Sequence, residues 1–322
     1  MFFSIDFETM DPWLELGEEA LRQYIDARSV FEACEVAREK AALVRGGMIW
    51  RTVKEREYLI RTRSDGSQNS LGARSEDTEQ VYRKFVERKE SAEARVKSLK
   101  EELDKQQRLN RALFVGRAPD ILVGILNMLD RLSISEHFIV VGTHALYAYE
   151  SAAGVRLQEA ALATRDVDLL WDTRKRLQFV SRMKAMDTSM LGALRKVDKT
   201  FELDELQPFT AVNSKGFEVD IIRREHGDDD PHPLRLTDDE GDFWAVQARR
   251  TNVLLSAKPF STPIVATSGK MARMRTIDPR TFVEFKRWMA DLPDRDPVKV
   301  SRDRLQASIV ERLTADRLSH LR

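Results

Sequence analysis

Two aspartates that stand two residues apart in an apolar segment place the strongest constraint on how this chain folds. Asp166 and Asp168 alternate with apolar residues in TRDVDLLWD, residues 164–172. This alternation predicts a strand over residues 165–171, whose period of two sends both carboxylates to the same face. Aspartate is depleted in strands, and two carboxylates about 7 Å apart along a strand can share hard cations such as Mg²⁺. The pattern therefore favours a metal site over a strand edge that merely faces solvent.

An apolar run that ends in a glycine precedes these aspartates. FIVVGTHALYAYE, residues 138–150, predicts a strand over 138–141 and a helix over 143–153. A side chain at Gly142 would block the approach of a phosphate to the backbone at the start of this helix. Thr143 fits two roles that can hold together, a helix N-cap and a donor of its hydroxyl and amide to a β- or γ-phosphate.

A third acidic candidate lies further along the chain. Asp220 stands between Val219 and Ile221 in GFEVDIIRRE, residues 216–225, and this run predicts another strand over 217–223. As a third metal ligand, Asp220 would also be placed to deprotonate or orient an attacking hydroxyl group.

These three features together resemble the polymerase-β-like nucleotidyltransferase superfamily. They are Gly-Thr at a strand-to-helix turn, Asp-x-Asp on a strand, and a later aspartate on another strand. The segments GGMIWR, YLIRTRSDG, LGARSEDTE, VGTHALYAYE and ATRDVDLLWD narrow the resemblance. They look like a bacterial set of nucleotidyltransferase-fold proteins that carry their own N-terminal helical and hairpin extension.

The resemblance implies an α/β (α+β) fold with a nucleotidyltransferase core and a mixed sheet. N-terminal helices with a β-hairpin and a C-terminal helical region would flank this core. It also implies that Asp166, Asp168 and Asp220 hold two Mg²⁺ ions, with Mn²⁺ as the alternative ion, and serve as the catalytic residues. The turn at Gly142 and Thr143 would contact the nucleoside triphosphate.

The resemblance further implies a basic residue near the triphosphate, after the core. Lys270 is the first candidate, in a helix expected over residues 268–275, and Lys286 is the second, in a helix expected over 281–290. For each, an ordinary surface cation is the alternative. His144 fits a helix-surface histidine, with approach to a phosphate or to the acceptor as its alternative. Asp166 lies 23 residues beyond Thr143, more than is usual in the superfamily, so we expect a longer helix or a loop over the nucleotide.

The pattern of the chain predicts three regions. Residues 1–115 form an N-terminal region with helices over 18–45 and about 76–110, a hairpin over 48–53 and 57–63, and a loop over 64–73. Residues 116–225 form the catalytic core. Residues 226–322 contain an acidic loop and C-terminal helices. The evenly charged faces of the long helix over 76–110 suit either solvent or a partner protein.

Charge and cysteine content bear on the binding partners and the cellular compartment that we expect for the protein. The 53 basic residues balance 53 acidic ones, so no overall field points to nucleic acid. Residues 249–322, however, carry 16 Lys or Arg against eight Asp or Glu, which suits polyphosphate or RNA as well as ordinary solvated helices. Cys34 is the single cysteine, and we expect a cytoplasmic protein with no signal peptide and no membrane-spanning helix.

The resulting hypothesis is a Mg²⁺-dependent nucleotidyltransferase. It would transfer a nucleoside monophosphate from an NTP, for example ATP, to an acceptor hydroxyl and release pyrophosphate. The basic C-terminal segment favours the 3′ end of an RNA or tRNA as acceptor, with a protein or a small molecule as alternatives. A toxin role is an expectation on resemblance alone. Two other functions stay open, a non-catalytic nucleotide- or nucleic-acid-binding module on the same fold and an Asp-x-Asp glycosyltransferase.

Overall fold

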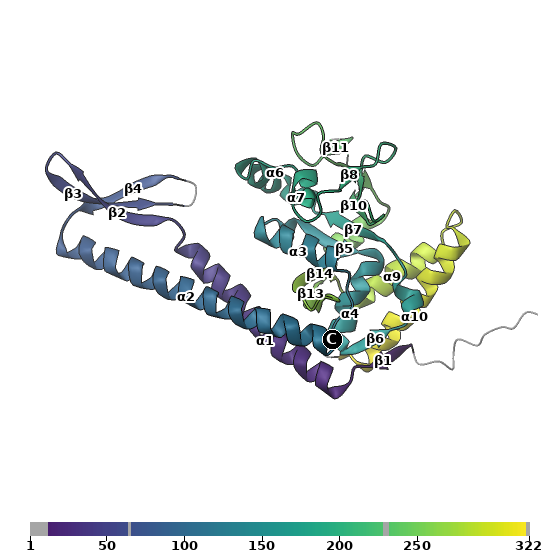
Figure 1. Cartoon of the computed structure of the whole chain (residues 1–322). Coiled ribbons are helices and arrows are strands. Elements are labelled where there is room, and N and C mark those ends of the chain that lie inside the picture. The colour runs from purple at the N-terminus through teal and green to yellow at the C-terminus, as the bar shows by residue number, and fades with distance from the viewer. Residues whose placement is uncertain (1–11, 64–65, 228–231, 320–322) are drawn as a thin grey trace, which may run out of the picture. The chain divides into compact units, whose positions relative to one another are not determined.

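The computed structural model describes residues 12–63, 66–227 and 232–319 and contains two compact units (Figure 1). One unit is Arg22–Leu113, and the other joins Met1–Leu21 to Phe114–Arg322. Within the described ranges, no helix is both long and apolar enough to cross a membrane.

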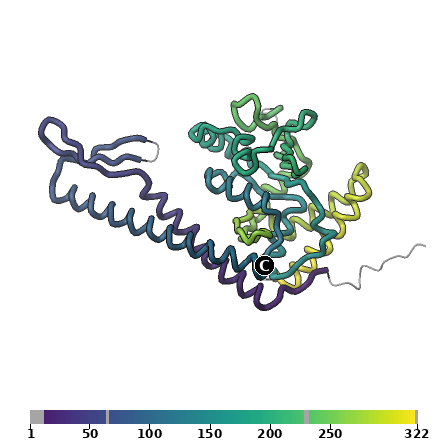
Figure 2. The backbone as a smooth tube through the Cα atoms, in the orientation of Figure 1, coloured from purple at the N-terminus to yellow at the C-terminus, as the bar shows by residue number. Residues whose placement is uncertain are grey.

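The unit of residues 22–113 is built from two long helices and a small antiparallel sheet. The chain runs along one helix, forms a three-stranded sheet and returns along the second helix. Figure 2 traces this path of the backbone. These elements are α1 (Glu18–Leu43), β2 (Gly47–Val53), β3 (Arg56–Thr62), β4 (Gln68–Ala73) and α2 (Glu76–Ala112). Both predicted helices and the predicted hairpin are confirmed, whereas the segment expected as a loop contains strand β4.

The start of α2 follows from its sequence. Ser75 is the N-cap, and its hydroxyl accepts a hydrogen bond from the backbone N–H of Thr78 at 3.3 Å. In return, the hydroxyl oxygen of Thr78 accepts a hydrogen bond from the backbone N–H of Ser75 at 2.8 Å, which completes a capping box. Cys34 is buried and packs with Ala37 and Leu99 between the two helices.

The second unit is organised around a mixed sheet. Strand β7 is antiparallel to β5 on one side and parallel to β10 on the other. The described strands of this sheet are β5 (Phe138–Val141), β7 (Asp166–Trp171), β8 (Glu202–Leu203), β9 (Thr210–Val212), β10 (Glu218–Arg223), β11 (Leu234–Arg235) and β12 (Trp244–Gln247). The expected mixed-sheet α/β core is therefore confirmed.

Helices cover both faces of this sheet. One face packs on α3 (Asp120–Arg131), α6 (Arg176–Ala185) and α7 (Met190–Arg195) through a cluster that includes Val167, Leu169 and Trp171 of β7. The other face packs on α4 (Leu146–Ala153), α9 (Pro279–Ala290) and α10 (Pro297–Asp316) through a cluster that includes Leu170. Because side chains alternate along a strand, Asp166 and Asp168 lie on the same face as Leu170.

The segment expected as a helix over residues 268–275 is a strand instead. It belongs to a hairpin of β13 (Pro259–Val265) and β14 (Met271–Ile277). In β14 the buried Ala272 and Met274 alternate with half-buried Arg273 and Arg275, which is the period of a strand. Met, Ala and Arg are all good helix formers, so packing overrides local propensity here.

The segment between the Gly-Thr turn and the Asp-x-Asp strand contains several short elements. Gly142–Ala145 forms a 3₁₀ turn that leads into α4. After α4 come β6 (Val155–Leu157), which pairs with β1 (Trp13–Glu15), and α5 (Glu159–Leu162). Outside this segment, three other short helical elements are η2 (Ser135–His137), η4 (Thr173–Lys175) and α8 (Thr251–Ser256).

We predict that one largely buried ion pair is important for the stability of this unit. Arg117 Nη2 donates to Glu150 Oε2 at 2.5 Å, and Glu150 Oε2 also accepts from the backbone N–H of Leu157 at 2.9 Å. Glu150→Ala would leave the guanidinium without its partner and should lower the free energy of unfolding by about 3 kcal/mol. Chemical denaturation would measure this change.

The matched control is an ion pair of the same type in solvent. Arg287 and Glu311 are 2.6 Å apart, and both side chains are more than half exposed. Glu311→Ala should change the free energy of unfolding by less than about 1 kcal/mol. Equal effects of Glu150→Ala and Glu311→Ala would contradict the role of burial.

Candidate active site

Three aspartates meet where strands β7 and β10 lie side by side (Figure 1). Asp168 and Asp220 are register partners across this parallel pair, and Asp166 lies two residues before Asp168 on the same face. One carboxylate oxygen from each of the three lies within 4.8 Å of the others. The sheet thus brings together the three carboxylates that the sequence singled out.

The local sequence fixes each of these carboxylates. Val167 and Val219 are buried on the opposite face of the sheet, so β7 and β10 cannot slip by one residue without exposing them. Thr210 in β9 donates its hydroxyl to Asp220 Oδ1 at 2.5 Å. Thr164, just before β7, donates its hydroxyl to Asp166 Oδ1.

The electrostatics of the cluster match a site for a divalent cation. Burial, together with the neighbouring charges of Asp166 and Asp220, raises the pKa of Asp168 to about 7. Burial also raises the pKa of Asp220, against the hydrogen bond from Thr210, which lowers it. Clustered carboxylates repel one another in a partly buried site, and a hard cation with oxygen ligands relieves that repulsion. The residues present therefore fit a divalent metal ion.

Gly142 leaves room for one of the three carboxylates, that of Asp168. Its φ is +67°, in the left-handed region, and a Cβ atom at this position would overlap Asp168 Oδ2. We expected the missing side chain to leave room for a phosphate. In the structure the space that a side chain would fill belongs to the Asp168 carboxylate, because Val141 of β5 is the register partner of Asp168.

Thr143 contacts a residue that the sequence did not single out. Gln306 of α10 is fully buried, with 0% of its surface exposed, and its Nε2 lies 3.1 Å from Thr143 Oγ1 and 2.7 Å from the carbonyl oxygen of Ala161. A carbonyl can only accept, so the atom between the two oxygens is the amide nitrogen. Thr143 Oγ1 therefore accepts from Gln306, which leaves the hydroxyl hydrogen of Thr143 available for another acceptor.

The two predicted lysines lie in different places. Lys286 of α9 is buried, and its Nζ donates to Asp303 Oδ1 at 2.7 Å. Burial lowers the pKa of Lys286, while the charge of Asp303 and, more weakly, that of Asp168 raise it. Lys286 is thus close enough to the acidic cluster to interact with Asp168 electrostatically.

Lys270 does not reach the cluster. It is exposed at the turn of the β13–β14 hairpin, next to Met271, whose carbonyl oxygen accepts from Asn127 at 2.9 Å. The contact of β14 with β5 near the site is made by Thr276, whose hydroxyl donates to the carbonyl oxygen of Val140 at 2.7 Å. Six residues of strand, about 20 Å, separate Lys270 from that contact.

A second lysine near the cluster comes from α10. Lys299 lowers the pKa of both Asp168 and Asp220 through its charge. On the same helix Arg302 donates to the carbonyl oxygen of Ala163 at 2.8 Å. Lys299, Arg302 and Gln306 follow the spacing i, i+3 and i+7, which places them on one side of a helix. This polar stripe was the sequence signal that could have revealed them.

His144 is not the surface histidine that its position predicts. Only 1% of it is exposed, and its Nδ1 lies 2.9 Å from the carbonyl oxygen of Asp166. Burial lowers its pKa to about 4, so its ring is neutral near pH 7. The ring packs against Tyr147 and Phe217, which makes His144 a structural support of β7.

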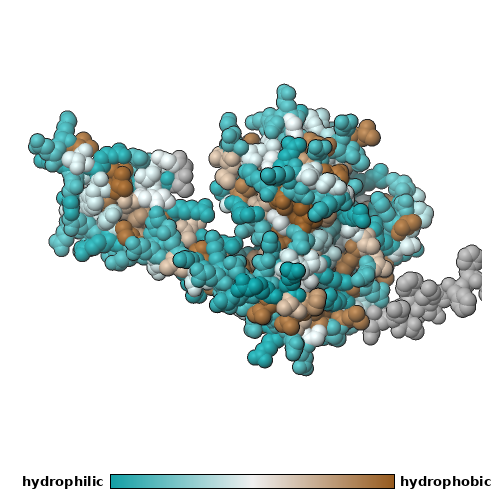
Figure 3. Space-filling view, viewed as in Figure 1, coloured by the Kyte–Doolittle hydropathy of each residue, from teal (hydrophilic) through white to brown (hydrophobic). Residues whose placement is uncertain are grey.

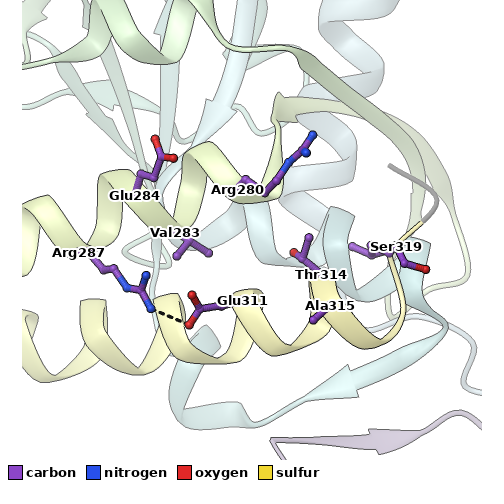
Figure 4. Close-up of a pocket in the computed structure, with 9 residues that line it drawn as sticks. Arg280, Val283, Glu284, Arg287, Glu311, Thr314, Ala315 and Ser319 are labelled. Carbon is purple, nitrogen blue, oxygen red and sulfur yellow. Dashed lines mark hydrogen bonds and ion pairs between the residues drawn. The ribbon is translucent and has the colours of Figure 1, made fainter. Parts of the chain in front are cut away.

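A cavity between α9 and α10 lies apart from the acidic cluster. It has a volume of about 420 Å³, and Figure 4 shows the charged side chains of Arg280, Glu284, Arg287 and Glu311 at its walls. The ion pair of Arg287 and Glu311 crosses it. None of the three aspartates lines this cavity, so we do not assign it to the site.

We predict that Gly142→Ala weakens metal binding. A methyl group at this position would displace the Asp168 carboxylate and strain a left-handed backbone. The affinity for Mg²⁺ or Mn²⁺ should fall about 10- to 100-fold, the range known for changes that reorient a metal ligand. Isothermal titration calorimetry would measure it.

Gly154→Ala is the matched control for that variant. Gly154 has the same φ of +67° and ends helix α4. Its substitution should destabilise the protein by a similar backbone strain and leave the metal affinity of the folded protein unchanged. A metal affinity that is equal in wild type and Gly142→Ala would refute the prediction.

Comparison with known proteins identifies the family. Residues 121–322, more than half of the chain and the part that contains the acidic cluster, match the nucleotidyltransferase family. Comparisons with curated proteins and with solved structures found no match. The family match favours nucleotidyl transfer over the glycosyltransferase alternative, and it confirms the resemblance seen in the sequence. The chain belongs to the nucleotidyltransferase family and is an enzyme of that type.

Proposed function

We propose that this protein transfers a nucleoside monophosphate from an NTP to a hydroxyl group of an acceptor. The observation that carries the proposal is the cluster of Asp166, Asp168 and Asp220, whose carboxylate oxygens lie within 4.8 Å of one another. The Gly-Thr turn lies directly beside it, since Val141 pairs with Asp168. This arrangement supports a phosphoryl-transfer site in which positioning and charge neutralisation supply most of the catalysis.

We assign the three aspartates as the ligands of Mg²⁺, with two ions per site and Mn²⁺ as a substitute. When bound, divalent ions would neutralise charge on the phosphates and orient the reacting oxygens. The carboxylates suit this role because one oxygen of each lies within 4.8 Å of an oxygen of the other two. The hydroxyls of Thr164 and Thr210 each donate to Oδ1 of Asp166 and Asp220, which holds these two carboxylates in place.

Asp220 is our candidate for the group that takes the proton of the acceptor. Its raised pKa brings it closer to the pKa that suits a general base at neutral pH. In the transfer the acceptor oxygen forms a bond to the α-phosphorus, and the bond from that phosphorus to the β-phosphate oxygen breaks. The proton of the acceptor hydroxyl passes to Asp220, and pyrophosphate leaves.

The triphosphate would lie between the Gly-Thr turn and helices α9 and α10. Thr143 has a hydroxyl hydrogen free to donate to a phosphate oxygen, because Gln306 donates to its Oγ1. Lys286 and Lys299 interact electrostatically with the acidic cluster and would supply positive charge for the phosphates. We therefore assign Lys286 and Lys299 as the basic residues near the triphosphate. Lys286 was already a candidate from the sequence, and Lys299 takes the place of Lys270.

An RNA or tRNA 3′ end is the acceptor that we favour over a protein or a small molecule. The support is the surplus of eight basic residues in residues 249–322, since phosphodiester strands bind through Lys and Arg. ATP is one candidate nucleotide among the four. A non-catalytic module that binds nucleotides on the same fold is the alternative, and binding of NTP without turnover would favour it.

The transfer is tested by a label-transfer assay. Each of the four α-labelled NTPs is incubated with Mg²⁺, total RNA and a host lysate. Wild type should label one fraction, and Asp166→Asn or Asp168→Asn should lower the rate on the order of 10³-fold or more. Asp130→Asn, on the exposed side of α3, is the control and should keep full activity. Labelling by the folded Asp168→Asn variant at the wild-type rate would exclude the proposed site.

A double-mutant cycle tests the hydrogen bond from Gln306 to Thr143. Thr143→Val removes the hydroxyl, and Gln306→Met removes the amide that orients it. Each should weaken binding of a non-hydrolysable NTP analogue by about 10-fold, the effect of losing one hydrogen bond. The two effects should not add in the double variant, because both remove the same contact to the nucleotide. Additive effects would show that Gln306 does not act through the hydroxyl of Thr143.

A further inference from the structure

The unit of residues 22–113 contains a groove of about 890 Å³ between the end of α1, the sheet of β2 and β3, and α2. We call it the cationic groove, because five basic side chains line it and one acidic side chain does. The basic residues are Lys40, Arg61, Lys84, Arg88 and Arg95, and the acidic one is Glu87.

Four of these cations have no ion pair, hydrogen bond or ring contact with any described residue. Arg61 differs, because it donates to the carbonyl oxygens of Gly47 and Thr62 at 3.1 and 2.6 Å and lies over the ring of Phe85. Arg61 thus builds the wall of the groove. The other four, Lys40, Lys84, Arg88 and Arg95, present free positive charge to its opening.

Two neighbouring cations lie on the side of α2 that lines this groove. Lys84 and Arg88 are four residues apart on the helix, so two like charges face each other there. In contrast, Lys89 pairs with Glu93, and Lys105 pairs with Glu102, on other parts of the helix surface. A polyanion in the groove would relieve the repulsion that the helix alone leaves unbalanced.

The positive charges form a row. From Lys84 to Arg88 the helix rises about 6 Å, and from Arg88 to Arg95 about 10 Å. Lys40 stands on α1, at the opposite wall. A row of charges with a further cation across from it suits a ligand that carries a charge on every unit of its length, as a phosphodiester strand does.

The floor of the groove is apolar. Leu43 is 82% exposed and Val81 is 44% exposed, and both line the groove together with Phe85. Figure 3 shows hydrophobic side chains surrounded by hydrophilic ones over this unit. Unpaired bases bring apolar faces that can cover such side chains, whereas a duplex keeps its bases stacked inside.

We propose that the cationic groove binds a single-stranded segment of RNA. The choice of RNA rests on the proposed function, in which an RNA 3′ end is the favoured acceptor. Phosphates of the strand would pair with Lys84, Arg88, Arg95 and Lys40, and bases would lie on Leu43 and Val81. The groove thereby holds acceptor RNA at a site distinct from the three aspartates.

The test measures binding of a fluorescein-labelled U15 RNA to the full-length protein by fluorescence anisotropy. EDTA is present and nucleotide is absent, so the result does not depend on catalysis. The double variant Arg88→Glu/Arg95→Glu should weaken binding at least 10-fold. It should also reduce the magnitude of the slope of log K against log salt by about 1.4, because each phosphate contact with a single strand contributes about 0.7 to that slope and two contacts are removed.

Two further variants separate the groove from a general charge effect. Lys97→Glu/Lys100→Glu makes the same change in net charge on the same helix, at exposed residues outside the groove. It should leave the affinity within about threefold of wild type, since long-range charge alone is screened by salt. Leu43→Ser should weaken binding and leave the salt slope unchanged, because it removes an apolar contact only.

The outcomes distinguish the inference from the proposed function. Equal loss of affinity in the two double variants, or no binding of U15 by wild type, would overturn the groove as an RNA site. Tighter binding of an acidic amphipathic peptide of Glu and Leu, abolished by Arg88→Glu/Arg95→Glu, would make it a protein-docking site and overturn it as well. RNA binding in the groove with no label transfer would refute the proposed function alone.

Discussion

The mutual repulsion of three carboxylates is the constraint on which the catalytic unit depends. Asp166, Asp168 and Asp220 bring oxygens to within 4.8 Å of one another, a distance at which like charges in a partly buried site oppose folding. The sheet tolerates this arrangement because Val167, Leu169, Val219 and Ile221 are buried on its other face. Hydrophobic burial thus holds in place an acidic site that electrostatics alone would push apart.

The residues around the cluster follow from that constraint. Gly142 leaves the space that the Asp168 carboxylate fills, and the hydroxyls of Thr164 and Thr210 donate to Asp166 and Asp220. Lys286 is itself buried, and Asp303 holds it, while Arg295 donates to the other oxygen of Asp303 at 2.7 Å. The positive charge of Lys286 is therefore fixed within the core.

The sequence predicted the parts of the chain in which local pattern and tertiary structure agree. The alternation around Asp166 and Asp220 was enough to place both on strands, and the helical pattern over residues 76–110 was enough to place α2. Prediction failed at β14, where Met, Ala and Arg favour a helix in isolation, and at β4, where Gly, Ser and Asn suggested a loop. Lys299 and Gln306 were missed because α10 meets the Gly-Thr turn only in the folded chain.

The order of the strands has a consequence for how the site is assembled. Asp168 and Asp220 are direct neighbours across the sheet, yet 51 residues of chain lie between them, including α6, α7, β8 and β9. A fragment that ends before β10 holds two carboxylates at most, on a strand whose parallel neighbour is missing. Occupancy of the site by an ion is therefore a property of the completed sheet, and the Asp-x-Asp segment on its own has no third ligand to offer.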